Sequence, residues 1–158
     1  MRIIKRDEAL VLFKNQEVNL VTGSFDLVHA GHIDFLKQAK AHSPQIPLLV
    51  IVLDDIAIAA RKGSDRPIYS LQDRLTILSA ISYIDYLLPW EYSWEEIRDF
   101  VGKIKLINLF VTPKDPGLDN KMEIARNNGF KLVELKQYNE VSTTSIIERI
   151  KKDAKESK

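Results

Sequence analysis

Two patterns of hydrophobic residues alternate along the chain. Short β-branched or continuously apolar runs predict strands, and the run from Pro47 to Leu53 is typical of a strand buried on both faces. Stripes of apolar residues three or four positions apart, such as Leu71, Leu75 and Leu78, predict amphipathic helices. The predicted strands cover residues 18–22, 47–53, 83–88, 106–111 and 130–135, and the predicted helices cover 7–14, 32–41, 71–81, 94–101, 121–127 and 145–152.

The alternation of strands and helices predicts an α/β domain. Because strands joined by helical crossovers lie parallel, we expect a three-layer, doubly wound, Rossmann-like domain with a parallel five-stranded sheet. Ligands of such domains bind at the carboxyl ends of the strands, near the point where the strand order reverses. We expect the domain to cover residues 1–150 and the charged segment 151–158 to fray.

The composition narrows the possible partners. The chain has 158 residues and a formal net charge of +1, which gives no reason to expect nucleic acid as a partner. It has no cysteine, so disulfides, thiolate nucleophiles and thiolate zinc sites are excluded. No apolar run approaches the roughly 20 residues of a membrane span, and the N-terminus is too charged for a secretory signal. We therefore expect a cytoplasmic protein that binds neither membranes nor nucleic acid.

The segment from Gly23 to His32 joins a predicted strand to a predicted helix. Gly23 and Gly31 allow a tight turn and the close approach of a ligand. His29 and His32 lie at or before the first helical turn, where free N–H groups and the helix dipole favour phosphate. Two imidazoles there would stabilise charge during transfer at phosphorus. Two alternatives are ordinary polar residues at a helix start and a metal site, although no third metal ligand is obvious.

A second segment, residues 61–68, is basic and rich in turn formers. It predicts a mobile cationic loop at the same end of the sheet as the histidines. Lys62 and Arg66 have the reach to contact phosphates, and Gly63 and Pro67 shape the path between them. Arg74 belongs to the next predicted helix, where a surface salt bridge is an equally good interpretation.

A third segment, Ser142 to Thr144, places hydroxyl groups at the start of the last predicted helix. Such residues cap helices, and Ser145 and Glu148 have the spacing of a capping box. A helix start rich in hydroxyls is also suited to hold a triphosphate. We expect both roles together.

The three segments resemble the signature of the HxGH cytidylyltransferase-like nucleotidyltransferase superfamily. Gly23-Ser-Phe-Asp26 followed by His29-Ala-Gly-His32 is similar to its first motif. The resemblance covers nearly the whole chain, and within the family the pattern is most similar to the heptose 1-phosphate adenylyltransferase domain. Glycerol-3-phosphate cytidylyltransferase is a more distant relative by this comparison. The other matching segments are Val52-Leu-Asp-Asp55, Lys62-Gly63, Arg66-Pro-Ile68, Asp73-Arg74 and Ser142-Thr-Thr144.

The resemblance implies a nucleotidyltransferase of the HUP-type fold. A phosphate oxygen of a sugar or polyol phosphate would attack the α-phosphorus of ATP or CTP, and pyrophosphate would leave. Mg²⁺ would arrive with the triphosphate, since the sequence shows no dedicated carboxylate cage, and relatives are commonly homodimers. The implied catalytic residues are His29, His32 and Lys62; the implied nucleotide-binding residues are Gly23, Ser24, Phe25, Gly31, Asp55, Arg74, Ser142, Thr143 and Thr144; the implied substrate-binding residues are Asp26, Arg66 and Asp115.

The chain departs from the heptose pattern after Val111. The relatives continue with Lys-Gly-Gly-Asp-Tyr, whereas this chain has Thr112-Pro-Lys-Asp-Pro-Gly117, in which only Asp115 aligns. Lys114 either replaces the missing charge from a shifted position or is a solvated turn lysine. This segment helps recognise the base and the sugar in the relatives. The departure therefore leaves open which base and which sugar this chain binds.

Two further observations concern the branch of the family and the class of function to which the chain is assigned. The cytidylyltransferases have an arginine near the position of Gln137 or Tyr138, which argues mildly against that branch. The altered segment after Val111 is also compatible with a nucleotide-binding module that has lost catalysis. A non-enzymatic α/β interaction domain is the remaining alternative.

Overall fold

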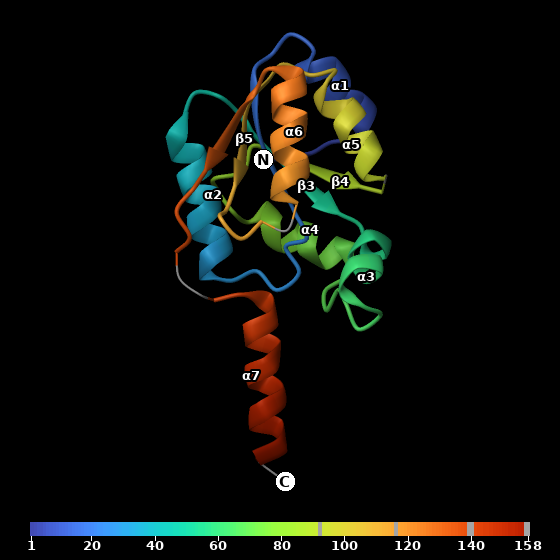
Figure 1. The fold of residues 1–158 in the computed structure, drawn as a ribbon, viewed down its shortest axis with the longest axis vertical. Coiled ribbons are helices and arrows are strands. Elements are labelled where there is room, and N and C mark those ends of the chain that lie inside the picture. The colour runs from blue at the N-terminus through green and yellow to red at the C-terminus, as the bar shows by residue number, and fades with distance from the viewer. Residues whose placement is uncertain (92, 116, 139–140, 157–158) are drawn as a thin grey trace.

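The computed structural model describes residues 1–91, 93–115, 117–138 and 141–156. In this part of the chain a single sheet of six parallel strands has the order β1-β4-β3-β2-β5-β6, with helices on both faces (Figure 1). The predicted three-layer parallel fold is confirmed, and the short edge strand β1 (Arg2–Ile3) is added to the five predicted strands. Those five are β2 (Val18–Gly23), β3 (Leu48–Leu53), β4 (Tyr86–Trp90), β5 (Leu106–Val111) and β6 (Lys131–Glu134).

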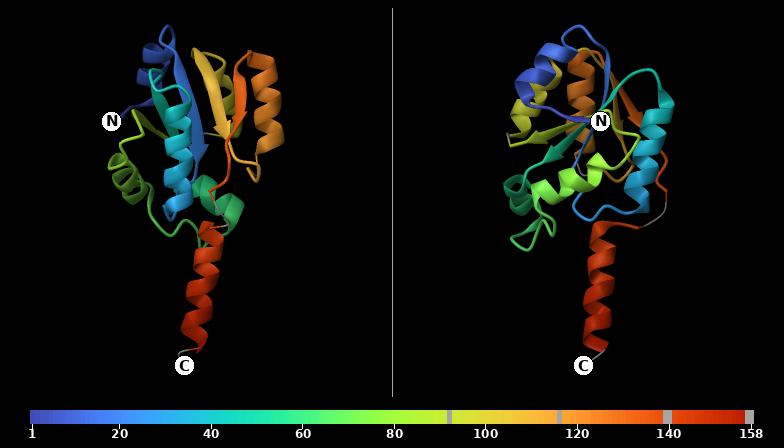
Figure 2. Two further views of the ribbon diagram at one scale, coloured as in Figure 1. Left: turned by 90° about the vertical axis from the view of Figure 1, so that its left-hand side faces the viewer. Right: turned by 180° about the vertical axis from the view of Figure 1, so that it is seen from behind.

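Helices cover both faces of the sheet (Figure 2), and each face has its own hydrophobic core. One core joins the sheet to α1 (Arg6–Phe13), α5 (Trp94–Val101) and α6 (Leu118–Asn128). The other core joins it to α2 (Ala30–His42) and α4 (Leu71–Ser79). The central strands are therefore buried on both faces, as the continuous apolar run in β3 predicts.

The helix α3 (Asp55–Lys62) is the main element that the sequence pattern does not predict. It begins at the cap residue Asp54, whose side chain accepts a 2.7 Å hydrogen bond from the backbone N–H of Ala57. It is only eight residues long and Ile58 is its buried residue, so it lacks the stripe of several buried apolar residues by which the longer helices were predicted. The expectation of a loop from residue 61 was therefore wrong by two residues, because Lys62 ends a helix and the loop begins at Gly63.

Strand β4 begins later than predicted. Ile84 donates its backbone N–H to the carbonyl of Ile81, so residues 81–84 form a turn before the strand. The strand continues through Pro89, which lies beyond the two residues that pair with β1. A proline is tolerated there because, in the described part of the chain, no strand on that side requires its missing N–H.

The last helix, α7 (Thr143–Glu156), extends away from the body of the domain (Figures 1 and 2). It starts two residues earlier than predicted and continues through most of the segment expected to fray; residues 157 and 158 lie outside the described residues. None of the described helices combines the length and the apolar character of a membrane span.

Candidate active site

A cleft lies at the carboxyl ends of β2, β3 and β5, where the strand order reverses. It has two adjoining halves of about 480 and 400 Å³. We call them the α6 half, lined by Arg61, Asn120 and Lys121, and the α7 half, lined by His29 and Tyr138. Residues that line both halves are Thr22, Gly23, Ser24, Phe25, His32, Lys62, Asp115 and Thr143.

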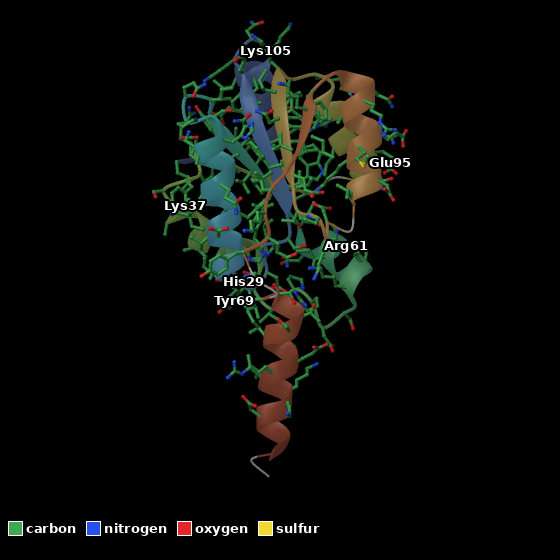
Figure 3. All side chains as sticks on the ribbon, turned by 60° about the vertical axis from the view of Figure 1, so that its left-hand side comes forward. His29, Lys37, Arg61, Tyr69, Glu95 and Lys105 are labelled. Atoms are coloured by element: carbon green, nitrogen blue, oxygen red, sulfur yellow. The ribbon has the colours of Figure 1, made fainter. Side chains whose placement is uncertain are left out.

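All three sequence motifs meet at this cleft. His29, Arg61 and Tyr69 lie at the end of the body nearest to α7, whereas Lys105 lies at the opposite end (Figure 3). A Cβ placed on Gly31 would lie 3.7 Å from the carbonyl oxygen of Val141, so the start of α2 and the segment before α7 are in close proximity.

The two histidines cap the helix that follows them. Nδ1 of His29 accepts the backbone N–H of Gly31 at 3.1 Å, and Nδ1 of His32 accepts the N–H of His29 at 3.4 Å. The ring centroids are 4.0 Å apart. Because both Nδ1 atoms act as acceptors, we assign the proton of each neutral imidazole to Nε2, which is then a donor.

Both imidazoles favour the neutral form. Burial lowers the pKa of His29, and burial, followed by the proximity of His29 and Lys62, lowers the pKa of His32 to about 4. The site therefore offers two neutral hydrogen-bond donors next to the N-terminus of α2, where the helix dipole favours an anion.

Gly23 and Phe25 shape the turn that leads to these histidines. Phe25 has a φ of 49°, an uncommon backbone conformation for an aromatic residue, and its ring lies 5.3 Å from that of His32. A Cβ on Gly23 would lie 2.8 Å from the Phe25 ring. Glycine is thus required at position 23 for the close approach of this ring.

Asp26 and Arg66, both predicted to bind substrate, contact each other instead of standing free. Asp26 is 1% exposed, and it accepts hydrogen bonds from Arg66 Nε at 2.6 Å and from the backbone N–H groups of Ile68 and Tyr69 at 2.7 and 3.0 Å. The carboxylate thereby fixes the loop after α3 against the first motif.

Two basic residues at the end of α3 line the cleft. Lys62 lines both halves, and its pKa is lowered by burial, then by Arg66 and Arg61. Arg61 donates a 3.2 Å hydrogen bond from Nη2 to the hydroxyl of Ser24. The first and second motifs therefore form one cationic wall.

Arg74, predicted to bind nucleotide, is fully buried. Its guanidinium donates to the carbonyl oxygens of Ser24, Leu53 and Tyr69 at 2.6, 2.7 and 3.1 Å, and to the carboxylate of Asp55 at 2.6 Å. In this structure no surface of Arg74 is left for a nucleotide. Arg74 instead holds the ends of β2 and β3 in place, with Asp55 as its charged partner.

The hydroxyl segment starts α7. Ser142 Oγ accepts the N–H of Ser145 at 3.1 Å, and Ser145 Oγ accepts the N–H of Ser142 at 2.9 Å. The capping pair is thus Ser142 with Ser145, in place of the predicted Ser145 with Glu148. Thr143 lines both halves of the cleft, while Ser142 and Thr144 line the α7 half.

Lys121 is a cleft residue that the sequence interpretation did not include. Its ammonium lies 2.7 Å from the carboxylate of Asp115, and its side chain is only 5% exposed. Burial lowers its pKa, and Asp115 raises it. Lys121 stands three and four positions before the buried residues Ile124 and Ala125, and this helical spacing was the available signal that it points inward.

The described residues contain no cluster of three or more His, Cys, Asp or Glu side chains that could hold a metal ion. The cleft is built from two imidazoles, lysines, Arg61, hydroxyls and helix N-termini, together with the carboxylates of Asp26 and Asp115, which have basic partners. Such a set of groups binds and polarises phosphate.

The family model described as cytidylyltransferase-like matches residues 20–149. The chain belongs to the cytidylyltransferase-like family of nucleotidyltransferases. The matched range of this family begins in β2 and ends in α7, so it includes every described residue of the cleft.

Curated relatives share this segment. The chain is 30% identical over 141 residues to the bifunctional protein HldE of Pseudomonas putida, covering 88% of this chain and 29% of the relative. The HldE of Azotobacter vinelandii is 29% identical over 146 residues, with 88% of this chain and 29% of the relative covered. The chain thus spans less than a third of the length of these relatives.

Solved structures support the fold. A lipopolysaccharide core biosynthesis protein from Thermoplasma volcanium has a TM-score of 0.59 at 23% identity, covering 78% of this chain and 98% of that chain. The pantothenate synthetase of Thermus thermophilus has a TM-score of 0.61 at 14% identity, covering 92% and 67%. At these identities the likeness concerns the fold alone.

Proposed function

We propose that this member of the family joins ATP or CTP to a phosphorylated sugar or polyol and releases pyrophosphate. The observation that carries the proposal is the pair of neutral imidazoles at the N-terminus of α2, in a cleft that the N-terminus of α7 also lines. The positive ends of two helix dipoles and a lysine surround the same space, and this arrangement favours the binding of a polyphosphate.

In the proposed reaction a phosphate oxygen of the acceptor attacks the α-phosphorus of the nucleotide. The bond between this phosphorus and the bridging oxygen of the β-phosphate breaks, and pyrophosphate leaves in line with the attack. The Nε2–H groups of His29 and His32 donate to the α-phosphate oxygens, and Lys62 neutralises the charge that develops on the leaving group. The hydroxyls of Ser142, Thr143 and Thr144 hold the triphosphate.

A heptose 1-phosphate is the proposed acceptor and ATP the proposed nucleotide. The similarity to the HldE proteins and the motif from Lys62 to Ile68 support this choice. A cytidylyltransferase acting on glycerol 3-phosphate is the alternative, and the altered segment from Thr112 to Gly117 leaves a third possibility of nucleotide binding without transfer.

Three accompanying proposals concern the metal ion, the cellular location and the oligomeric state. We propose that Mg²⁺ enters with the triphosphate, held mainly by phosphate oxygens, because the described residues offer no carboxylate cluster. The carboxylates of Asp26 and Asp115 already have basic partners. We also propose a cytoplasmic homodimer, from resemblance to the family.

The test is pyrophosphate release with ATP and with CTP against a panel of sugar 1-phosphates, heptose 1-phosphate included, and glycerol 3-phosphate. We expect His29→Ala and His32→Ala to lower kcat at least about 100-fold, as the loss of one preorganised donor to a developing charge does in other enzymes. His42→Ala, which removes an exposed histidine at the far end of α2, should keep the wild-type kcat. Near-normal turnover in both cleft variants would refute the mechanism, and nucleotide binding without pyrophosphate release from any acceptor would favour the third possibility.

A further inference from the structure

The ion pair between Lys121 and Asp115 is a polar feature of the cleft that the proposed reaction does not use. Its side chains are 5% and 16% exposed, so the pair is largely shielded from water. Asp115 uses its other carboxylate oxygen to accept the backbone N–H of Gly117 at 2.9 Å. Lys121 lines the α6 half and not the α7 half, whereas Asp115 lies at the border of the two.

The chemistry of the proposed reaction assigns a role to each half. In an in-line displacement the attacking and leaving oxygens lie on opposite sides of the phosphorus. The α7 half is enclosed by the N-termini of α2 and α7, which favour the triphosphate and its leaving group. The acceptor then approaches from the α6 half, and His32 and Lys62 lie at the junction.

We propose that Lys121 is a specificity-determining residue that, together with Asp115, hydrogen-bonds the hydroxyl groups of the acceptor's sugar or polyol. This inference rests on the proposed function for the direction of approach. An ammonium has three donors, and among the described residues Asp115 accepts from one of them, so two donors remain for ligand oxygens. The carboxylate in turn has lone pairs that accept hydroxyl protons.

The charge balance of the pair favours hydroxyls over a second phosphate. Asp115 compensates the charge of Lys121 at 2.7 Å, so the pair presents a dipole instead of a free cation. Asn120 and Ser93, which also line the α6 half, add neutral polar groups. The acceptor that fits this half therefore has several hydroxyls for the pair of Lys121 and Asp115, and its single phosphate is left to the cation of Arg61 and to His32 at the junction.

The test compares acceptors that differ only in hydroxyls. Glycerol 3-phosphate and n-propyl phosphate share a phosphate and a three-carbon chain, and sugar 1-phosphates, including heptose 1-phosphate, extend the series. Dissociation constants are measured by calorimetry for the wild type and for Lys121→Met. We expect the variant to bind the preferred hydroxylated acceptor at least about tenfold more weakly, the effect of losing hydrogen bonds to a charged group. Its affinity for n-propyl phosphate and for ATP should change less than about threefold.

Lys105→Met is the matched control, because Lys105 is a half-exposed lysine at the end of the body opposite to the cleft (Figure 3). It should leave the preference for the hydroxylated acceptor over n-propyl phosphate unchanged. Should the stranded carboxylate of Asp115 prevent Lys121→Met from folding, the double variant Asp115→Asn, Lys121→Met removes both charges and should show the same loss of preference.

The outcomes separate this inference from the proposed function. If the wild type binds a hydroxylated phosphate in preference to n-propyl phosphate but releases no pyrophosphate, and the variant loses that preference, the inference stands and the proposed function fails. If the wild type is an active transferase and the variant keeps its preference, the inference fails alone. A wild type that binds hydroxylated acceptors no better than n-propyl phosphate, or a variant that loses ATP affinity to the same extent, also overturns it.

Discussion

At the scale of the residue, the polar atoms of the site form two groups. Some of them hold backbone segments in place, and the others remain available for a ligand. The guanidinium of Arg74 and the carboxylate of Asp26 make their hydrogen bonds to backbone groups of neighbouring segments and to the side chains of Asp55 and Arg66. The Nδ1 atoms of His29 and His32 do the same for the start of α2. The Nε2 atoms thereby acquire a fixed direction, and preorganised donors of this kind lower a barrier most effectively.

The depressed pKa of His32 predicts how stability depends on pH. Folding lowers this pKa from its ordinary value of 6.5 to about 4, so between these values the unfolded chain binds more protons than the folded protein. The stability associated with neutral His32 is full above pH 6.5 and is lost as the pH falls toward 4. We expect urea unfolding to show a shallower decline in the free energy of unfolding between pH 6.5 and 4.5 for His32→Asn than for the wild type. His42→Asn is the control, and equal slopes for His32→Asn and the wild type would contradict the shift.

At the scale of the element, the ends of helices decide where the functional groups lie. Apolar periodicity predicted the five long strands and the helices that cover them, because burial of those faces dominates their stability. It did not predict α3, in which Ile58 is the buried residue and the cap at Asp54 supplies the start. The motifs indicated the histidines, Lys62 and the hydroxyls, but the burial of Arg74 and the pairing of Lys121 with Asp115 arise from contacts between distant segments.

The end of α3 depends on Gly63. Its φ of 98° and ψ of 161° lie in a region that is essentially restricted to glycine, and this conformation turns the chain from Lys62 into the loop. We expect Gly63→Ala to lower the free energy of unfolding by about 1–3 kcal/mol and to reduce turnover by displacing Lys62. Gly102→Ala is the control: Gly102 ends α5 with a φ of −72°, and the nearest obstacle to a Cβ is the flexible end of Asn128. The free energy of unfolding from chemical denaturation and the kcat should therefore change little in Gly102→Ala. An equal loss of stability in the two variants would contradict the argument from the backbone conformation of Gly63.

At the scale of the whole molecule, the cleft joins the central strand to the last helix. The start of α7 lines the cleft, but the rest of the helix extends beyond the body of the domain (Figure 2). Ile150 on this helix is 61% exposed. A helix held mainly at one end opens locally more easily than the core helices, because few apolar contacts resist its opening.

A nucleotide that bridges α2 and α7 should therefore stabilise α7 more than any other element. Binding to the closed state adds a free energy that local opening of α7 must overcome, so exchange of its amides slows by mass action. We expect saturating ATP or CTP to slow hydrogen exchange at least about fivefold in the first turns of α2 and α7. Exchange in α1, which packs on the opposite face of the sheet from α2, should stay unchanged. If calorimetry shows the nucleotide bound while exchange in α7 is unaffected, the hydroxyls of Ser142 to Thr144 do not hold the triphosphate, and their role is confined to capping the helix.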